Sequence, residues 1–278
     1  MDGTTLINVS YAGRVATITI DNDKKLNALT ADGYYAIAKA LREIAKRDDI
    51  YITILTGKGR YFSAGADVSI GARKPASSGG GGGDGDIYRE WLRGFVANNL
   101  DVTRAFTQHP KILVAALNGP AVGLSAALVA SADFVYAAPH AFLLTPFSSL
   151  GLVAEGGASR ALVQRLGVAK ANEALIQSRR IPCAELVAAG FVNRVFDCAV
   201  GDSDAFLSRV RREVNERMGD HLVGESLLGI KELIRRPERE ILDRQNVAEV
   251  FAGLERFMSG VPQEEFRKLA SGEKRHKL

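Results

Sequence analysis

The first two thirds of this chain alternate short apolar, β-branched runs with segments of helical periodicity, and this alternation constrains the fold more than any other feature. An alternating run after a turn at Gly13 predicts a β-hairpin over residues 7–20. A chain in which strands and helices alternate buries its apolar residues in a layered core. The predicted fold class is therefore α/β. Three further buried strands are predicted at residues 50–55, 111–116 and 133–138.

Two helices are predicted between these strands. The first begins after Asn27-Ala-Leu-Thr30, with Thr30 and Asp32 as capping candidates. The second extends from Ile87 to Thr107 and stops before His109-Pro110. On the first helix, the side chains expected on one buried face are Tyr35, Ala38, Leu41, Ile44 and Ala45.

The 278 residues divide into two regions by composition. Residues 1–200 carry the strands and are expected to form the core. The charged sequence at 201–278 predicts a helical region, with one helix at 226–234 and a longer one at 241–258. Inside the core, residues 71–86 contain two serines followed by five glycines, which is typical of a flexible surface insertion. A phosphate-binding loop is disfavoured there, because no strand precedes the glycines and no Gly-Lys-Ser/Thr ending follows.

Charge and cysteine content argue against several classes of function. Lysine and arginine total 36 against 32 aspartates and glutamates, without a basic stripe of interleaved aromatics, which disfavours nucleic-acid binding. Cys183 and Cys198 belong to no CxxC pair, so neither a disulfide framework nor a metal site is predicted. The apolar stretch 112–132 is interrupted by Asn118-Gly-Pro120 and therefore predicts a strand, a turn and a helix rather than a membrane span.

Glu155 is the only formal charge between Asp133 and Arg160. Its neighbours from Leu150 to Gly157 are apolar or small, and a lone carboxylate in such a setting is costly unless it has a partner or a task. Burial would raise its pKa toward the range of a general base. An equally good interpretation is a carboxylate at the start of a helix, where the backbone dipole favours it.

Two loops of small residues each follow a predicted strand. Phe62-Ser-Ala-Gly-Ala-Asp67 allows a ligand to approach the backbone closely. Asn118-Gly-Pro-Ala-Val-Gly123 does the same and leads into a helix whose first N–H groups are unpaired. Two N–H groups converging from such loops would form an oxyanion hole, although small residues in these turns are also common packing devices.

In combination, these segments resemble the crotonase, or enoyl-CoA hydratase/isomerase, superfamily. The resemblance covers roughly residues 5–200 and depends on several segments in order. It implies a crotonase-type spiral of ββα turns and an oxyanion hole for the thioester oxygen of an acyl-CoA. The matching segments are Asn27-Ala-Leu29, the two loops, Asp133 and residues 184–192.

The resemblance also implies the residues that contact the substrate. The two oxyanion donors would be the N–H groups of Ala66 and Leu124. Leu124 replaces the glycine that is common at this position, but a backbone donor needs no particular side chain. The residues implied to bind the acyl-CoA are Ala64, Gly65, Ala66, Asp67, Val68 and Leu124.

Departures from the hydratase pattern indicate the reaction. Hydratases of this superfamily use two glutamates, and the matching positions here are Ala127 and Phe147. Glu155 lies a few residues further on and is similar in place to the base of peroxisomal Δ3,Δ2-enoyl-CoA isomerases. The resemblance thus implies that Glu155 moves a proton from C2 to C4 of a 3-enoyl-CoA in the β-oxidation of unsaturated fatty acids. Asn99 matches an asparagine near the active site of such isomerases and is a candidate to orient Glu155.

The resemblance carries further expectations about partners. The ending His276-Lys277-Leu278 is similar to the Ser-Lys-Leu peroxisomal address, so an import receptor is an expected partner and the peroxisomal matrix the expected location. A homotrimer or a dimer of trimers is implied through the helices after Gly201. No metal or redox cofactor is expected, because coenzyme A is part of the substrate and its thioester supplies the activation.

Three alternatives remain. A dienoyl-CoA isomerase would use the same fold, and a non-catalytic crotonase-fold interaction protein would keep the scaffold without turnover. A serine hydrolase is suggested by Gly123-Leu-Ser125-Ala-Ala127, which is similar to a nucleophile elbow. The second glycine of that motif is absent, and none of the four histidines lies in an evident triad motif.

Overall fold

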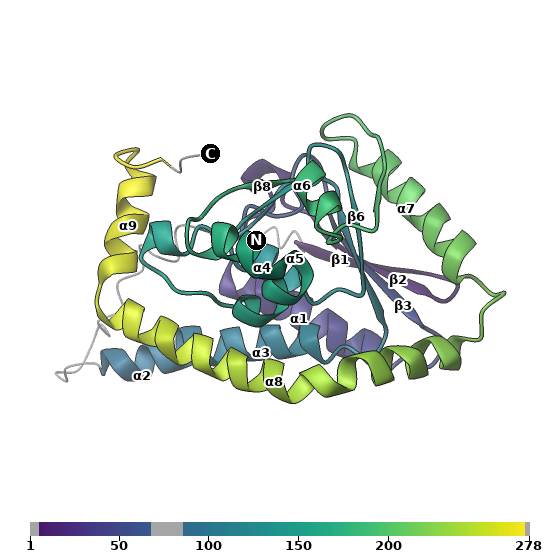
Figure 1. Ribbon diagram of the computed structural model, residues 1–278, viewed down its shortest axis with the longest axis horizontal. Helices are drawn as coiled ribbons and strands as arrows, with labels where there is room; N and C mark the ends of the chain where they lie inside the picture. The colour runs from purple at the N-terminus through teal and green to yellow at the C-terminus, as the bar shows by residue number, and fades with distance from the viewer. Residues whose placement is uncertain (1–5, 68–85, 276–278) are drawn as a thin grey trace, which may run out of the picture.

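The computed structural model describes residues 6–67 and 86–275, and these form a layered α/β fold (Figure 1). The predicted fold class is thereby confirmed. Val68, the ending His276-Lys277-Leu278 and all but the last residue of the predicted 71–86 insertion lie outside the described residues.

The larger of two sheets has six strands in the order β1-β2-β3-β4-β6-β9. Strands β1 and β2 form the predicted antiparallel hairpin, with Ala12 opposite Val15, and the other neighbours are parallel. Parallel neighbours need crossover connections, which the helices provide. A smaller sheet has the order β5-β7-β8. The strands are β1 Ile7–Ala12, β2 Val15–Ile20, β3 Ile52–Gly57, β4 Ile112–Leu117, β5 Ala121–Val122, β6 Phe134–Ala137, β7 Phe142–Leu144, β8 Ile181–Pro182 and β9 Arg194–Val195.

The helices differ from the sequence prediction in two places. Residues 87–107 are helical but include a π-helical turn, η3. Helix α8 continues through Pro237, so the prediction of two separate helices there is wrong. Packing along a helix stabilises it more than local propensity does, and α8 packs against α2, α3 and α5. The helices are η1 Asp23–Lys25, α1 Ala31–Ala45, α2 Ile87–Trp91, η3 Leu92–Val96, α3 Ala97–Thr107, α4 Leu124–Val129, η4 Ser148–Leu150, α5 Ala158–Leu175, α6 Cys183–Ala188, α7 Ser203–Met218, α8 Gly224–Met258 and α9 Val261–Ala270.

Helix α1 begins as the sequence predicts but turns a different tyrosine inward. The Thr30 hydroxyl caps the helix by accepting a hydrogen bond from Gly33 N–H at 3.2 Å. Tyr34 is 6% exposed, whereas Tyr35 is 52% exposed, so the placement of Tyr35 on the buried face is wrong. Successive helical residues differ in direction by about 100°. The buried face therefore runs through Tyr34, Ile37 and Leu41.

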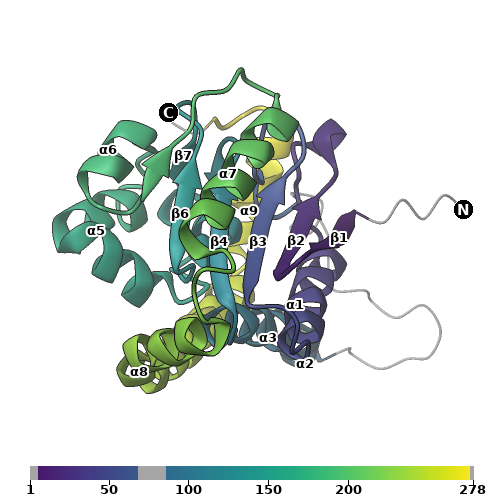
Figure 2. The ribbon, with the colours of Figure 1, turned by 90° about the vertical axis from the view of Figure 1, so that its right-hand side faces the viewer.

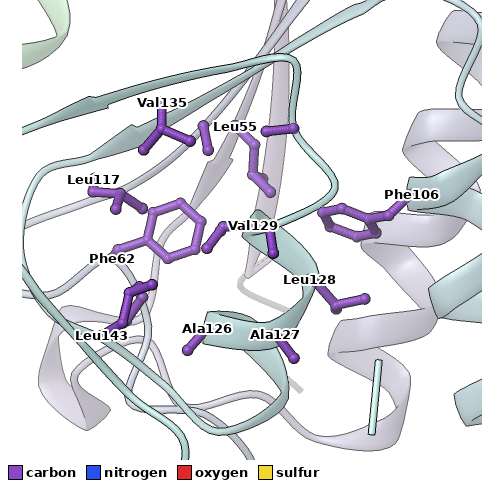
Figure 3. Close-up of a cluster of buried hydrophobic side chains, with 14 of the residues drawn as sticks. Leu55, Phe62, Phe106, Leu117, Ala126, Ala127, Leu128, Val129, Val135 and Leu143 are labelled. Carbon is purple, nitrogen blue, oxygen red and sulfur yellow. The ribbon is translucent and has the colours of Figure 1, made fainter. Parts of the chain in front are cut away.

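Helices cover both faces of the larger sheet, with α7 on one face and α1 and α3 on the other (Figure 2), where the residues of α4 join the same buried cluster. On the α7 face, Ile52 and Ile54 belong to the same buried cluster as Phe206. On the opposite face, Leu55 lies in the cluster that Figure 3 shows, together with Phe62 and residues of α4. Strands buried on both sides account for the nearly continuous apolar runs in the sequence.

Asp133 fastens α8 to the sheet. Its carboxylate accepts a hydrogen bond from Leu113 N–H at 2.7 Å and forms ion pairs with Lys231 at 2.6 Å and Arg235 at 2.9 Å. Both cations belong to α8, and all three charged side chains are largely buried. Within the described part of the chain, no helix has both the length and the apolar character needed to cross a membrane.

Two buried asparagines, one after β2 and one after β4, hold the loop that follows β3 in place. Asn118 accepts from Gly57 N–H at 3.0 Å and donates to Gly59 O and Tyr61 O. Asn27 accepts from Asn22 N–H at 2.7 Å and donates to Lys58 O and to Tyr61 O. These side chains satisfy backbone groups that irregular loops leave unpaired. The loop is thereby fixed at the carboxyl end of its strand.

Replacement of Asn118 by alanine should destabilise the protein by about 2–4 kcal/mol, because several buried backbone groups lose their hydrogen-bond partner. Urea unfolding at a fixed protein concentration measures this change. Asn172→Ala, which removes an exposed amide from α5, is the matched control and should change stability by about 0.5 kcal/mol or less. Equal destabilisation by the two variants would contradict the role assigned to Asn118.

Candidate active site

The Ala66 N–H group is directed away from the nearest backbone by a short bridge. Leu29 N–H donates to Gly65 O at 2.8 Å, and Leu29 O accepts from Asp67 N–H at 2.9 Å. In a parallel bridge the residue between the two bonded groups points its own N–H to the opposite side. Ala66 therefore offers its N–H to the space beside α4 rather than to Leu29.

The second candidate donor is the N–H of Leu124, the first residue of α4. The first N–H groups of a helix have no acceptor within it. Gly65 and Gly123 bring the two loops together, and both have positive φ values, of 86° and 60°. A Cβ atom on Gly65 would lie 2.8 Å from Val122 O, so only glycine fits at this contact.

A chain of buried hydroxyl groups holds the two loops side by side. The Tyr34 and Ser125 hydroxyl oxygens are 3.0 Å apart, Ser125 donates to Ser63 Oγ at 2.9 Å, and Ser63 donates to Asn27 O at 2.9 Å. Burial holds the pKa of Tyr34 well above its ordinary value, so this hydroxyl stays protonated. The Ser125 proton is engaged by Ser63 rather than by a histidine, which argues against a serine nucleophile.

Tyr34, Ala66 and Leu124 line a cavity of about 120 Å³ that lies between α1, α3, α4 and the carboxyl end of α8. The structure brings together five residues singled out from the sequence. Ala64 and Gly65 lie in the loop behind the cavity, where Ala64 N–H donates to Leu26 O and Gly65 N–H to Ser63 Oγ. Of the residues singled out from the sequence, those that contribute to the cavity wall are Ala66, Asp67, Asn99, Leu124 and Glu155.

Glu155 enters the cavity from a turn made by two glycines. Gly156 and Gly157 have φ values of 73° and 75°, which side chains rarely tolerate. A Cβ atom on Gly156 would lie 2.9 Å from Leu124 Cδ1 and 3.0 Å from Ala127 Cβ. The glycine therefore lets the turn that carries Glu155 pack directly on Leu124 and Ala127 of α4.

One amide contacts the Glu155 carboxylate. Asn99 Nδ2 donates to Glu155 Oε2 at 2.8 Å, and Asn99 is itself only 6% exposed. The pKa of Glu155 is raised to about 7, chiefly because the carboxylate is desolvated; the Asn99 hydrogen bond opposes this rise and the charge of Glu249 adds to it. No ion pair to Glu155 occurs among the described residues. A carboxylate with this pKa can both accept and return a proton near neutral pH.

Asp67 is the second acid of the cavity but differs in its surroundings. Lys25 Nζ lies 3.0 Å from Asp67 Oδ2. The two acids are thus distinguished by their partners, a cation for Asp67 and a neutral amide for Glu155.

Comparison with protein families agrees with this arrangement. The profile described as enoyl-CoA hydratase/isomerase matches residues 11–216, which is most of the chain. The chain belongs to the enoyl-CoA hydratase/isomerase family. Ala127 and Phe147, which the sequence analysis matched to the two hydratase glutamates, are both buried.

Relatives from fungi cover nearly the whole chain. The Delta(3,5)-Delta(2,4)-dienoyl-CoA isomerase of Pyricularia oryzae is 63% identical over 100% of both chains. The 3,2-trans-enoyl-CoA isomerase of Saccharomyces cerevisiae is 34% identical over 98% of this chain and 96% of the relative. Among solved structures, the enoyl-CoA hydratase/isomerase from Pseudoalteromonas atlantica superposes with a TM-score of 0.82 at 27% identity, over 99% of this chain and 100% of that one.

The sequence prediction missed part of the cavity wall in this member of the family. Tyr34 was overlooked because its neighbour Tyr35 fits the helical face almost as well. An aromatic wall comes from segments far apart in the sequence, which no local pattern connects. Phe257 stacks on Trp91 with ring centroids 4.5 Å apart and meets Phe95 at 4.7 Å. The wall of the cavity consists of Phe95, Phe257 and Phe266.

Glu155→Gln should stabilise the folded protein at pH 8. Between pH 4.5 and about 7 the unfolded chain releases the proton of Glu155 while the folded chain retains it, so stability falls as the pH rises. The loss amounts to at most about 3 kcal/mol and is absent in the glutamine variant. The melting temperature of the variant should exceed that of the native protein at pH 8 and approach it near pH 5.

Glu240→Gln, on the exposed side of α8, is the matched control and should show no such pH-dependent difference. A constant difference between Glu155→Gln and the native protein at both pH values would contradict the raised pKa.

Proposed function

We propose that the protein is an enoyl-CoA isomerase that converts 3-enoyl-CoA to trans-2-enoyl-CoA with Glu155 as the base. The observation that carries this proposal is the half-buried Glu155 carboxylate, which accepts a hydrogen bond from the neutral Asn99 amide in the cavity that Ala66 and Leu124 also line. A double-bond shift needs one base that both takes and returns a proton. Hydration would need a second carboxylate at position 127 or 147, where alanine and phenylalanine stand.

The steps follow from the arrangement of these groups. Glu155 removes a proton from C2, and the electrons of the C2–H bond move toward the thioester oxygen to form a dienolate. The N–H groups of Ala66 and Leu124 stabilise the charge on this oxygen, and each donor is worth on the order of 10²- to 10³-fold in rate. Glu155 then returns the proton to C4, so that the double bond lies between C2 and C3. The thioester supplies the activation, and the sequence of steps requires neither a metal nor a redox cofactor.

A 3,5-dienoyl-CoA is the second candidate substrate, and the 63% identity to a protein named as a dienoyl-CoA isomerase favours it. In that reaction the proton leaves C2 and returns at C6, so both double bonds move by one position. The proton then travels further than a shift to C4 requires. A single carboxylate would have to reach both ends, or Asp67, the other acid of the cavity, would have to serve the far end.

Purified protein should convert both 3-enoyl-CoA and 3,5-dienoyl-CoA if its acids can serve C6 as well as C4. It should convert only 3-enoyl-CoA if Glu155 acts alone and cannot reach C6. Glu155→Gln should lose about 10²- to 10⁴-fold in kcat while still binding acyl-CoA, because it removes only the base. Assays over several chain lengths, with Glu240→Gln as a control of unchanged rate, provide the measurement. Full activity of Glu155→Gln, or native protein inert toward both substrates, would refute the proposal.

The proposed place of this reaction is the peroxisomal matrix. The ending His276-Lys277-Leu278 supports this proposal by its similarity to a peroxisomal address. Deletion of Leu278 should leave a fluorescently labelled protein in the cytosol, since the import receptor reads the terminal leucine. Unchanged import would point to another signal or to entry with a partner.

A homotrimer or a dimer of trimers is the proposed assembly, and sedimentation of the purified protein tests it.

A further inference from the structure

The helix that follows Glu155 is capped by a different acid from a distant part of the chain. Glu249, on α8, accepts hydrogen bonds from Gly157 N–H at 2.7 Å and from Ser159 N–H at 2.8 Å, and it also accepts from the Ser159 hydroxyl. These donors form the first turn of α5 and the residue before it. Anionic groups are stabilised at such helix ends.

Glu249 is 5% exposed, and within residues 6–67 and 86–275 it forms no ion pair with a basic side chain. Burial raises the pKa of Glu249, while the hydrogen bonds from Ser159 and Gly157 lower it. Backbone donors therefore take the place of a counter-ion. Gln245, one turn earlier on α8, donates to the Ser159 hydroxyl at 2.8 Å and supports the same contact.

This capping decides between the two interpretations of Glu155. The positive end of α5 would attract the Glu155 carboxylate and make it a weaker base, but Glu249 already occupies that end. Glu155 is left with Asn99 of α3. Of the other titratable groups around the cavity, Tyr34 of α1 is engaged with Ser125, and Asp67 is paired with Lys25.

On the basis of the function proposed above, we propose that Glu249 is a positioning residue for the isomerase reaction. Its hydrogen bond to Gly157 N–H fixes the turn that carries Glu155. Its charge, and its occupation of the α5 end, keep Glu155 a stronger base than a carboxylate at a free helix end would be. Both effects act through Glu155, since Glu249 does not line the cavity.

Three substitutions separate charge from position. Glu249→Gln removes the charge, Glu249→Asp keeps the charge but shortens the reach to Gly157, and Ser159→Ala removes one donor while leaving the carboxylate in place. Glu249→Gln should shift the acid limb of the kcat/KM profile to lower pH and reduce kcat above pH 8 by about tenfold. Glu249→Asp should keep the acid limb closer to that of the native protein but lower kcat. Ser159→Ala should leave the acid limb in place and change kcat by no more than about twofold.

Asn99→Ala provides a test of opposite sign, because the Asn99 hydrogen bond favours the charged form of Glu155. Its acid limb should move to higher pH while that of Glu249→Gln moves to lower pH. If Glu249 only stabilises the fold, Glu249→Gln lowers the melting temperature and leaves the limb in place, which overturns the inference.

A direct titration keeps this inference separate from the proposed function. Carbon-13 NMR of labelled glutamate carboxyl groups follows Glu155 in the ligand-free protein, with the signal assigned by its loss in Glu155→Gln. A lower titration midpoint in Glu249→Gln supports the inference even if the native protein turns over neither enoyl-CoA. An unchanged midpoint overturns it even if the native protein is an active isomerase.

Discussion

The close contact between the loops after β3 and β4 is the constraint on which the site depends. Asn27 and Asn118 satisfy the backbone of the loop after β3, and Gly65 allows the two loops to meet with no side chain between them. The contact brings Ala66 and Leu124 to the wall of one cavity. If the loops separated, the two donors could no longer act on one oxygen atom, whatever base lay nearby.

Packing against α4 also links Ala127, which the sequence analysis matched to a hydratase glutamate, to the turn that carries Glu155. Gly156 packs against Leu124 and Ala127 of α4, so the turn that carries Glu155 occupies the space next to position 127. A longer side chain at 127 would push this turn away. The small residue at 127 and the position of the turn that carries Glu155 are therefore two aspects of one packing arrangement.

Much of the scaffold could be predicted because its signals are local. The hairpin, the buried strands and the Thr30 cap each depend on a few neighbouring residues, and the loops could be recognised as ligand-binding backbone from their small side chains. Asn99 and Glu155 were paired through the resemblance to isomerases. In the structure, Asn99 Nδ2 lies 2.8 Å from Glu155 Oε2.

Other features could not be predicted, because they depend on packing between distant segments. Helix α8 remains continuous through Pro237 because it packs along other helices, which a local breaker signal does not reveal. Tyr34 and Tyr35 are adjacent, and only the final rotation of α1 distinguishes them. Glu249 lies among many charged residues of the C-terminal helices, and nothing in the sequence marks it as the one that meets α5.

Phe257 of α8 and Phe266 of α9 line the cavity together with Glu155. During synthesis, a ribosome would expose the loops and Glu155 long before these aromatic side chains exist. In such a nascent chain, water reaches the carboxylate and its proton affinity remains ordinary. The raised pKa of Glu155 therefore arises only after α8 and α9 have been translated and have docked.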